Sequence, residues 1–91
     1  MSKSLNVLGL KVPVQIKKRI VVGNMECYGV YRPHRKTIEI HSPRDKATLI
    51  HEAFHALCDR LGIGLDPMIE EILANAVELL ITENFKVIQK K

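Results

Sequence analysis

SPRDKATLIHEAFHALCDRL, residues 42–61, is the stretch that decides the fold. Ser42 is a favoured N-cap residue and Pro43 suits the first helical position. Asp45 follows where a negative charge stabilises the positive end of the helix dipole. Apolar residues then recur every three or four positions to the end of the stretch. We therefore predict an amphipathic helix over about residues 43–61.

A second helix is predicted over about residues 67–84. Asp66 and Pro67 repeat the helix start signal, and a second apolar stripe follows them. Gly62 ends the first helix and Gly64 loosens the connection. Because the loop is short, the two helices are expected to pack as an antiparallel pair.

The chain before the first helix has the period of β-strands. Apolar and polar residues alternate over residues 11–17 and 37–41, and Gly23 marks a turn between these segments. Strands are therefore expected over about residues 5–41. Strands followed by two packed helices predict an α+β fold with a small antiparallel β-meander, formed by residues 1–91 as one domain.

The composition excludes several classes of protein. A chain of 91 residues with 46% apolar and 26% charged residues is typical of one small globular domain, not of a disordered segment. The longest stretch without a charged residue, residues 4–10, is far shorter than the about 20 residues that a membrane span needs. The first residues lack the apolar core of a signal peptide, and two cysteines are too few for a disulfide scaffold. We therefore expect a cytoplasmic protein without a membrane partner.

Charge is distributed unevenly along the chain. Residues 1–50 carry ten Lys or Arg and three acidic residues, whereas residues 51–91 carry four and seven. A basic half can bind nucleic acid, but only Tyr28 and Tyr31 lie near the basic clusters as stacking partners, and no nucleic-acid motif accompanies them. Nucleic acid is therefore a candidate partner that the sequence does not favour over a solvated basic surface.

The predicted first helix contains the motif His-Glu-x-x-His at residues 51–55. Residues four apart share one face of a helix, so His51 and His55 can bind one metal ion, and neutral imidazole is a good ligand for zinc. Glu52 then lies beside the ion without being a ligand, where a general base for a water molecule belongs. A catalytic zinc site also needs a third protein ligand and a position open to water.

The third ligand is predicted on the second helix. Glu71, Asn75 and Glu78 recur at intervals of four and three, as a polar stripe on an otherwise apolar helix. In an antiparallel helix pair this stripe places Glu71 at the metal, and Asn75, one turn further on, can hold a ligand histidine by its other ring nitrogen. Cys58 on the first helix and Glu70 on the second are the alternative ligands. A solvated acidic face would explain Glu70 and Glu78 without a metal.

These residues, TLIHEAFHAL at 48–57 followed by EILAN at 71–75, resemble the zincin metallopeptidases. Within the zincins the chain is most similar to the small ImmA/IrrE-like and SprT-like group that phages and mobile elements often encode, and the resemblance covers most of residues 25–84. It implies four site residues: the zinc ligands His51, His55 and Glu71, and the general base Glu52. It also implies that residues 37–41 form the sheet edge along which an extended peptide substrate pairs.

The sequence thus supports two functions. The first is a zinc-dependent metallopeptidase that hydrolyses a peptide bond of a protein or peptide substrate with a metal-activated water. The second is a non-catalytic, zinc-stabilised binding or regulatory module whose basic half contacts an acidic protein or nucleic acid. No single residue is predicted to stabilise the oxyanion; the candidates are Tyr28, Tyr31, His34 and His41. Neither the natural substrate nor the oligomeric state follows from the sequence.

Overall fold

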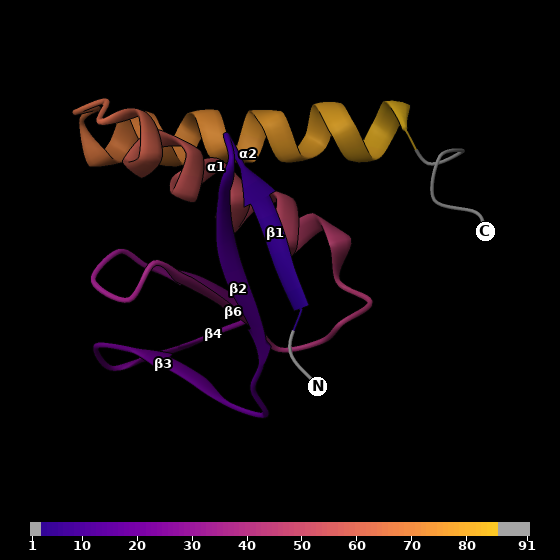
Figure 1. Cartoon of the computed structure of the whole chain (residues 1–91). Helices are drawn as coiled ribbons and strands as arrows, with labels where there is room; N and C mark the ends of the chain where they lie inside the picture. Colours follow the sequence, from indigo (N-terminus) through magenta and orange to yellow (C-terminus); the bar gives the residue numbers. More distant parts are fainter. Residues whose placement is uncertain (1–2, 86–91) are drawn as a thin grey trace.

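Strands come first in the chain and helices last (Figure 1). Within residues 3–85, which the computed structural model describes, six strands precede two helices. The strands are β1 (Lys3–Val7), β2 (Leu10–Ile16), β3 (Ile20–Val22), β4 (Met25–Cys27), β5 (Gly29–Arg32) and β6 (Thr37–Ile40). The helices are α1 (Lys46–Leu61) and α2 (Pro67–Asn84). The predicted α+β class, with strands followed by two helices, is confirmed.

The two helix starts differ in how well the sequence predicts them. Helix α2 begins at Pro67 as predicted, and the side chain of Asp66 accepts a hydrogen bond from the Met68 N–H at 2.9 Å. Helix α1 begins at Lys46, three residues later than predicted, and its N-cap is Asp45, not Ser42. The Asp45 carboxylate accepts from the Thr48 N–H at 3.0 Å, the usual N-cap bond to the third helical residue. The Ser42 carbonyl instead closes a turn by accepting from the Asp45 N–H at 3.1 Å.

The main sheet is mixed, so the predicted antiparallel meander is corrected. Four strands lie in the order β1-β2-β6-β5, and β3 pairs with β4 in a separate two-stranded sheet. The pairs β1–β2 and β5–β6 are antiparallel, whereas β6 lies parallel to β2, with Val14 opposite Ile38 and Ile16 opposite Ile40. The β3–β4 hairpin explains the difference, because it leads the chain away from β2 before β5 and β6 return. Pro13 immediately precedes the part of β2 that pairs with β6, so its missing N–H costs no bond there.

Strand β6 is central, so the expectation that residues 37–41 form the sheet edge is wrong. It pairs with β2 on one side and with β5 on the other, and all its residues are buried. Even Glu39 is buried, with its carboxylate 3.1 Å from the Arg32 guanidinium. The edge on this side of the sheet is β5.

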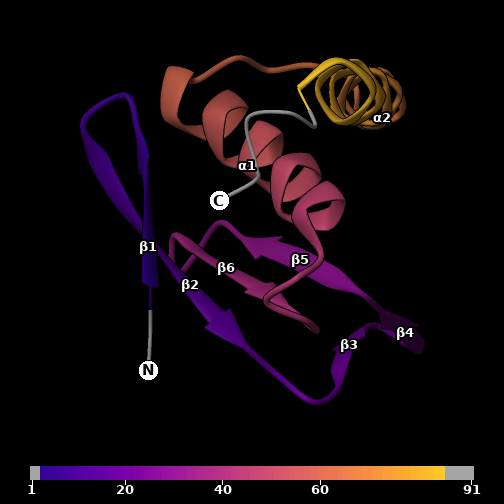
Figure 2. The same cartoon turned by 90° about the vertical axis from the view of Figure 1, so that its right-hand side faces the viewer.

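The molecule has three layers, with α1 between the sheet and α2 (Figure 2). The core lies between α1 and the sheet and contains Ala56 together with apolar side chains of three strands: Val7, Val12, Val14, Ile38 and Ile40. In α2, by contrast, Ala74 is the one buried residue. No helix in the described part of the chain is long and apolar enough to cross a membrane.

Candidate metal centre

Helix α1 presents His51 and His55 on one face, toward α2. Their ring centroids are 5.0 Å apart, and the rings are inclined by 66°. Both side chains are largely buried, with 13% of His51 and 19% of His55 exposed. The two imidazoles are therefore held next to each other at the junction of the two helices.

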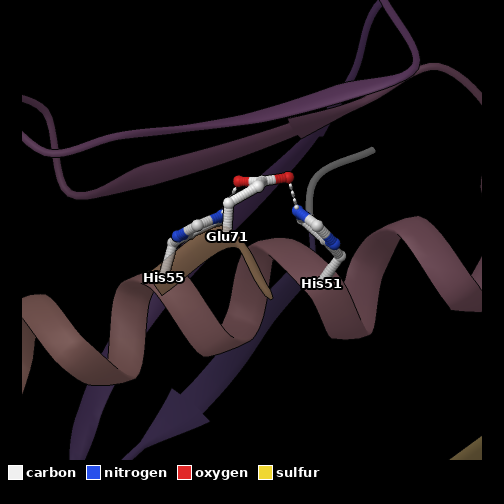
Figure 3. Close-up of side chains that lie close together, drawn as sticks. All are labelled: His51, His55 and Glu71. Carbon is white, nitrogen blue, oxygen red and sulfur yellow. Dashed lines mark ion pairs between the residues drawn. The ribbon is translucent and has the colours of Figure 1, made fainter. Parts of the chain in front are cut away.

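Glu71 of α2 completes the group. Figure 3 shows its carboxylate between the two imidazoles. One oxygen lies 2.9 Å from Nε2 of His51 and the other 3.2 Å from Nε2 of His55. Two N or O ligands of one tetrahedral zinc ion, each about 2.0–2.1 Å from it, are about 3.3 Å apart. The three ligand atoms lie within 4.8 Å of one another, so this group could hold a metal ion.

The outer nitrogen of each histidine contacts a further glutamate of α2. Nδ1 of His55 lies 2.6 Å from a Glu70 oxygen, and Nδ1 of His51 lies 3.2 Å from a Glu78 oxygen. Such contacts fix the tautomer and orientation of a ligand histidine and make it more basic. The sequence predicts this role for Asn75, yet no hydrogen bond within residues 3–85 joins Asn75 to either histidine. Glu70 and Glu78, whose side chains are longer than that of Asn75, contact these two nitrogens instead.

Glu52 lies beside the same group and is buried. Its burial raises the pKa of its carboxyl, and the charge of Glu71 adds to this effect. The nearby His55 and His51, and a hydrogen bond from the Tyr31 backbone, act in the opposite direction. The carboxyl group is therefore placed next to the candidate ligands and is largely, but not completely, shielded from solvent.

A cleft of about 550 Å³ opens beside these residues. His51, Glu52 and His55 form one wall, and Gly29 and Tyr31 of the edge strand β5 form another. The strand approaches α1 closely at Gly29, because a Cβ placed there would overlap the side-chain methyl group of Thr48. The cleft thus gives access to the candidate ligands from the open edge of the sheet.

The charge balance of the group favours a cation. Four carboxylates, those of Glu52, Glu70, Glu71 and Glu78, surround two imidazoles. Because partly buried like charges repel one another, a divalent cation at Nε2 of the histidines would stabilise the arrangement.

The alternative ligands lie elsewhere. Cys58 is buried, and burial, followed by the charge of Glu70, raises the pKa of its thiol, which disfavours the thiolate that zinc binds. Glu70 itself contacts the outer nitrogen of His55, away from Glu71. In the described part of the chain, the group that could hold a metal ion is His51, His55 and Glu71.

Of the four oxyanion candidates, Tyr31 lines the main cleft. Its hydroxyl donates to Asp59 at 2.6 Å, and burial, followed by this hydrogen bond, raises its pKa well above the usual range. Tyr28 borders a smaller hollow beside His51, and Nδ1 of His41 lies 3.3 Å from the Lys17 carbonyl.

Sequence reasoning missed the roles of Glu70 and Glu78. For Glu78 the signal was present in the spacing, since this residue is two turns from Glu71 and belongs to the polar stripe. Comparison with protein-family models, curated proteins and solved structures finds no match to this chain.

Proposed function

We propose that this chain is a zinc-dependent metallopeptidase of the zincin type, similar to the small ImmA/IrrE-like and SprT-like group. One observation supports this most directly. His51 and His55 of α1 and Glu71 of α2 converge within 4.8 Å, with Glu52 buried beside them at the wall of an open cleft. A structural zinc site is usually closed by four protein ligands, whereas three ligands and a cleft are typical of a catalytic one.

Zinc is the proposed metal because of the donor set. Two neutral imidazole nitrogens and one carboxylate oxygen are a common ligand set of zinc peptidases, whereas magnesium and calcium prefer oxygen ligands. When bound, zinc supplies a Lewis acid that makes water a better nucleophile and polarises a carbonyl group. Glu70 and Glu78 hold the two imidazoles in orientation through their Nδ1 atoms.

Glu52 is the proposed general base. Its carboxylate accepts one proton from the water that attacks the scissile carbonyl carbon. It then donates that proton to the amide nitrogen as the C–N bond breaks, so the products are a carboxylic acid and an amine. The side chain is mostly buried but lines the cleft, so a water molecule in the cleft can reach its carboxylate.

The proposed substrate is an extended segment of a protein or peptide that pairs with β5. The Tyr28 carbonyl accepts from the His41 N–H at 2.8 Å, and hydrogen-bonded pairs alternate along an antiparallel ladder. The backbone groups of Gly29 and Tyr31 therefore face away from β6, toward the cleft that both residues line. We place this reaction in the cytoplasm, where the two free cysteines remain reduced.

Metal content tests the site. Wild-type protein purified with excess zinc should contain one zinc per chain by elemental analysis, and Glu71→Ala should lose most of it. Glu83→Ala, which removes an exposed carboxylate from the same helix, is the matched control and should keep its zinc. Absence of zinc from the wild type, or full retention by Glu71→Ala, would contradict the proposed site.

Cleavage of an unstructured peptide library tests the reaction. Glu52→Gln should keep zinc and lose cleavage, whereas His51→Ala should lose both. An undiminished rate in Glu52→Gln would exclude the role of Glu52. A different outcome would favour the binding module. In that case the wild type binds zinc but cleaves no peptide, and it binds DNA with an affinity that depends on salt and that Glu52→Gln does not change.

A further inference from the structure

The face of α2 that points away from α1 is apolar and exposed. Figure 2 shows α2 as the outermost layer, with no other helix or strand of residues 3–85 on its far side. Six large apolar side chains of this helix are between 40% and 71% exposed: Met68, Ile69, Ile72, Leu73, Leu79 and Leu80. We call these six residues, with Ala76 among them, the outer face.

The outer face is continuous. At 100° per residue, its members fall within an arc of about 140° centred opposite Ala74, the buried residue of the helix. Glu83, in the last turn, is the one charged residue of α2 within this arc. The other charged side chains of α2 lie instead on the side that faces α1, so the exposed side of the helix is the apolar one. A continuous exposed apolar face of this kind indicates a partner.

The area of the outer face fits a dimer of this small chain. Fully burying one aliphatic side chain removes about 60–120 Å² of apolar surface, so the exposed parts of the six amount to about 200–400 Å². A stable interface buries about 800 Å² per partner, of which somewhat more than half is apolar. The outer face therefore supplies about half or more of the apolar area that one protomer contributes to such an interface.

The sequence of the outer face is compatible with two-fold symmetry. If two copies of α2 lie antiparallel and cross at Ala76, Ile72 faces Leu80 of the other copy, and Leu73 faces Leu79. The small Ala76 side chain at the centre allows close approach of the helices. The antiparallel orientation also aligns the two helix dipoles favourably and brings Glu83 near the positive end of the other α2. A C₂ interface requires this kind of self-complementarity.

We propose that a second copy of this chain covers the outer face, with the two α2 helices antiparallel about Ala76. The proposal does not depend on the metal or on peptidase activity. Glu70, Glu71 and Glu78 lie on the other side of α2, where they contact the histidines of α1. Dimerisation therefore leaves the cleft open while it covers the apolar surface.

Sedimentation equilibrium of the wild type and charged variants tests the interface. We expect a wild-type dimer, and a dimer dissociation constant raised about 100-fold or more in both Ile72→Lys and Leu79→Lys, because each substitution buries two unpaired charges. Leu8→Lys is the matched control, since Leu8 is 56% exposed against 58% for Ile72, and lies between β1 and β2. A wild type that remains monomeric, or a dimer that neither α2 substitution weakens, would overturn the proposal. Circular dichroism establishes that the variants remain folded.

Cross-linking tests the orientation. In a Cys27→Ser background, Ala76→Cys should cross-link to itself rapidly with a short bis-maleimide. Ile69→Cys, seven residues from the crossing point, should not, because its two copies would be about 21 Å apart. The reverse pattern would exclude the antiparallel arrangement about Ala76, and a parallel pair would cross-link at both positions.

Discussion

The contacts of Glu70 and Glu78 with the Nδ1 atoms of the histidines predict how substitutions of these glutamates change the zinc affinity. Glu70→Gln and Glu78→Gln remove a charge while keeping a side chain of the same length. Loss of such a partner typically weakens metal binding 10- to 100-fold. The Glu70–His55 distance is 2.6 Å, that of a strong charge-assisted hydrogen bond, whereas the Glu78–His51 distance is 3.2 Å. We therefore expect a loss of about 100-fold, or about 2.7 kcal/mol, for Glu70→Gln and about 10-fold for Glu78→Gln.

Competition with a chromophoric zinc chelator at neutral pH measures these affinities directly. Two controls on the same helix separate the effect from a general loss of carboxylates. Glu83→Gln removes an exposed charge, and Asn75→Ala removes the residue that the sequence predicts in this role; both should bind zinc within about threefold of the wild type. If Asn75→Ala loses more affinity than Glu70→Gln, the contacts described for the outer nitrogens do not hold the ligands and the reasoning is refuted.

Three further variants probe the fold around the site. Ile38→Ala should lower the free energy of unfolding in urea by about 2–5 kcal/mol, because Ile38 is fully buried; a loss below about 1 kcal/mol would contradict its place in the core. Gly29→Ala should lower it by about 1–3 kcal/mol, because the new Cβ overlaps Thr48, and an unchanged melting temperature would argue against this close approach. Hydrogen bonds from Lys36 and, to a smaller extent, from Tyr31 hold the pKa of the Asp59 carboxyl below its ordinary value of 3.8. Their contribution to the stability of the folded protein is therefore present above pH 3.8 and is lost as the pH falls below it. Asp59→Asn should thus reduce the acid sensitivity of unfolding between pH 5 and 2, and an identical pH profile would exclude this contribution.

Local patterns predicted the helices well because the signals that start and orient a helix lie within a few residues. Asp66 and Pro67 set the start of α2, and the four-residue spacing of His51 and His55 placed both on one face. The predicted start of α1, with Ser42 as the N-cap, was wrong by three residues. Ser42 and Asp45 are both good N-cap residues. Asp45 is the N-cap because residues 42–45 form a turn, closed by the Asp45 N–H and the Ser42 carbonyl, before the helix begins.

The partners of the glutamates on α2 depend on how two helices pack, which sequence periodicity does not specify. The stripe of Glu71, Asn75 and Glu78 gave the correct face of the helix. It did not show that Glu70, about 100° from Glu71, also reaches a histidine. That contact requires the actual crossing of α1 and α2, which places one glutamate on each outer nitrogen.

Strand pairing was the least predictable feature, and it is also the one that links the fold to the proposed reaction. Alternation shows which residues of a strand share a face, but not which strand lies beside it. Because β6 pairs in parallel with β2, it is enclosed, and β5 is left as the edge. Tyr31 of β5 and Glu52 of α1 both line the cleft, so this edge runs beside the proposed general base. A segment that pairs with β5 would therefore lie next to Glu52. In the expected meander, by contrast, the segment would pair with β6, and β6 would separate it from β5 and from Glu52.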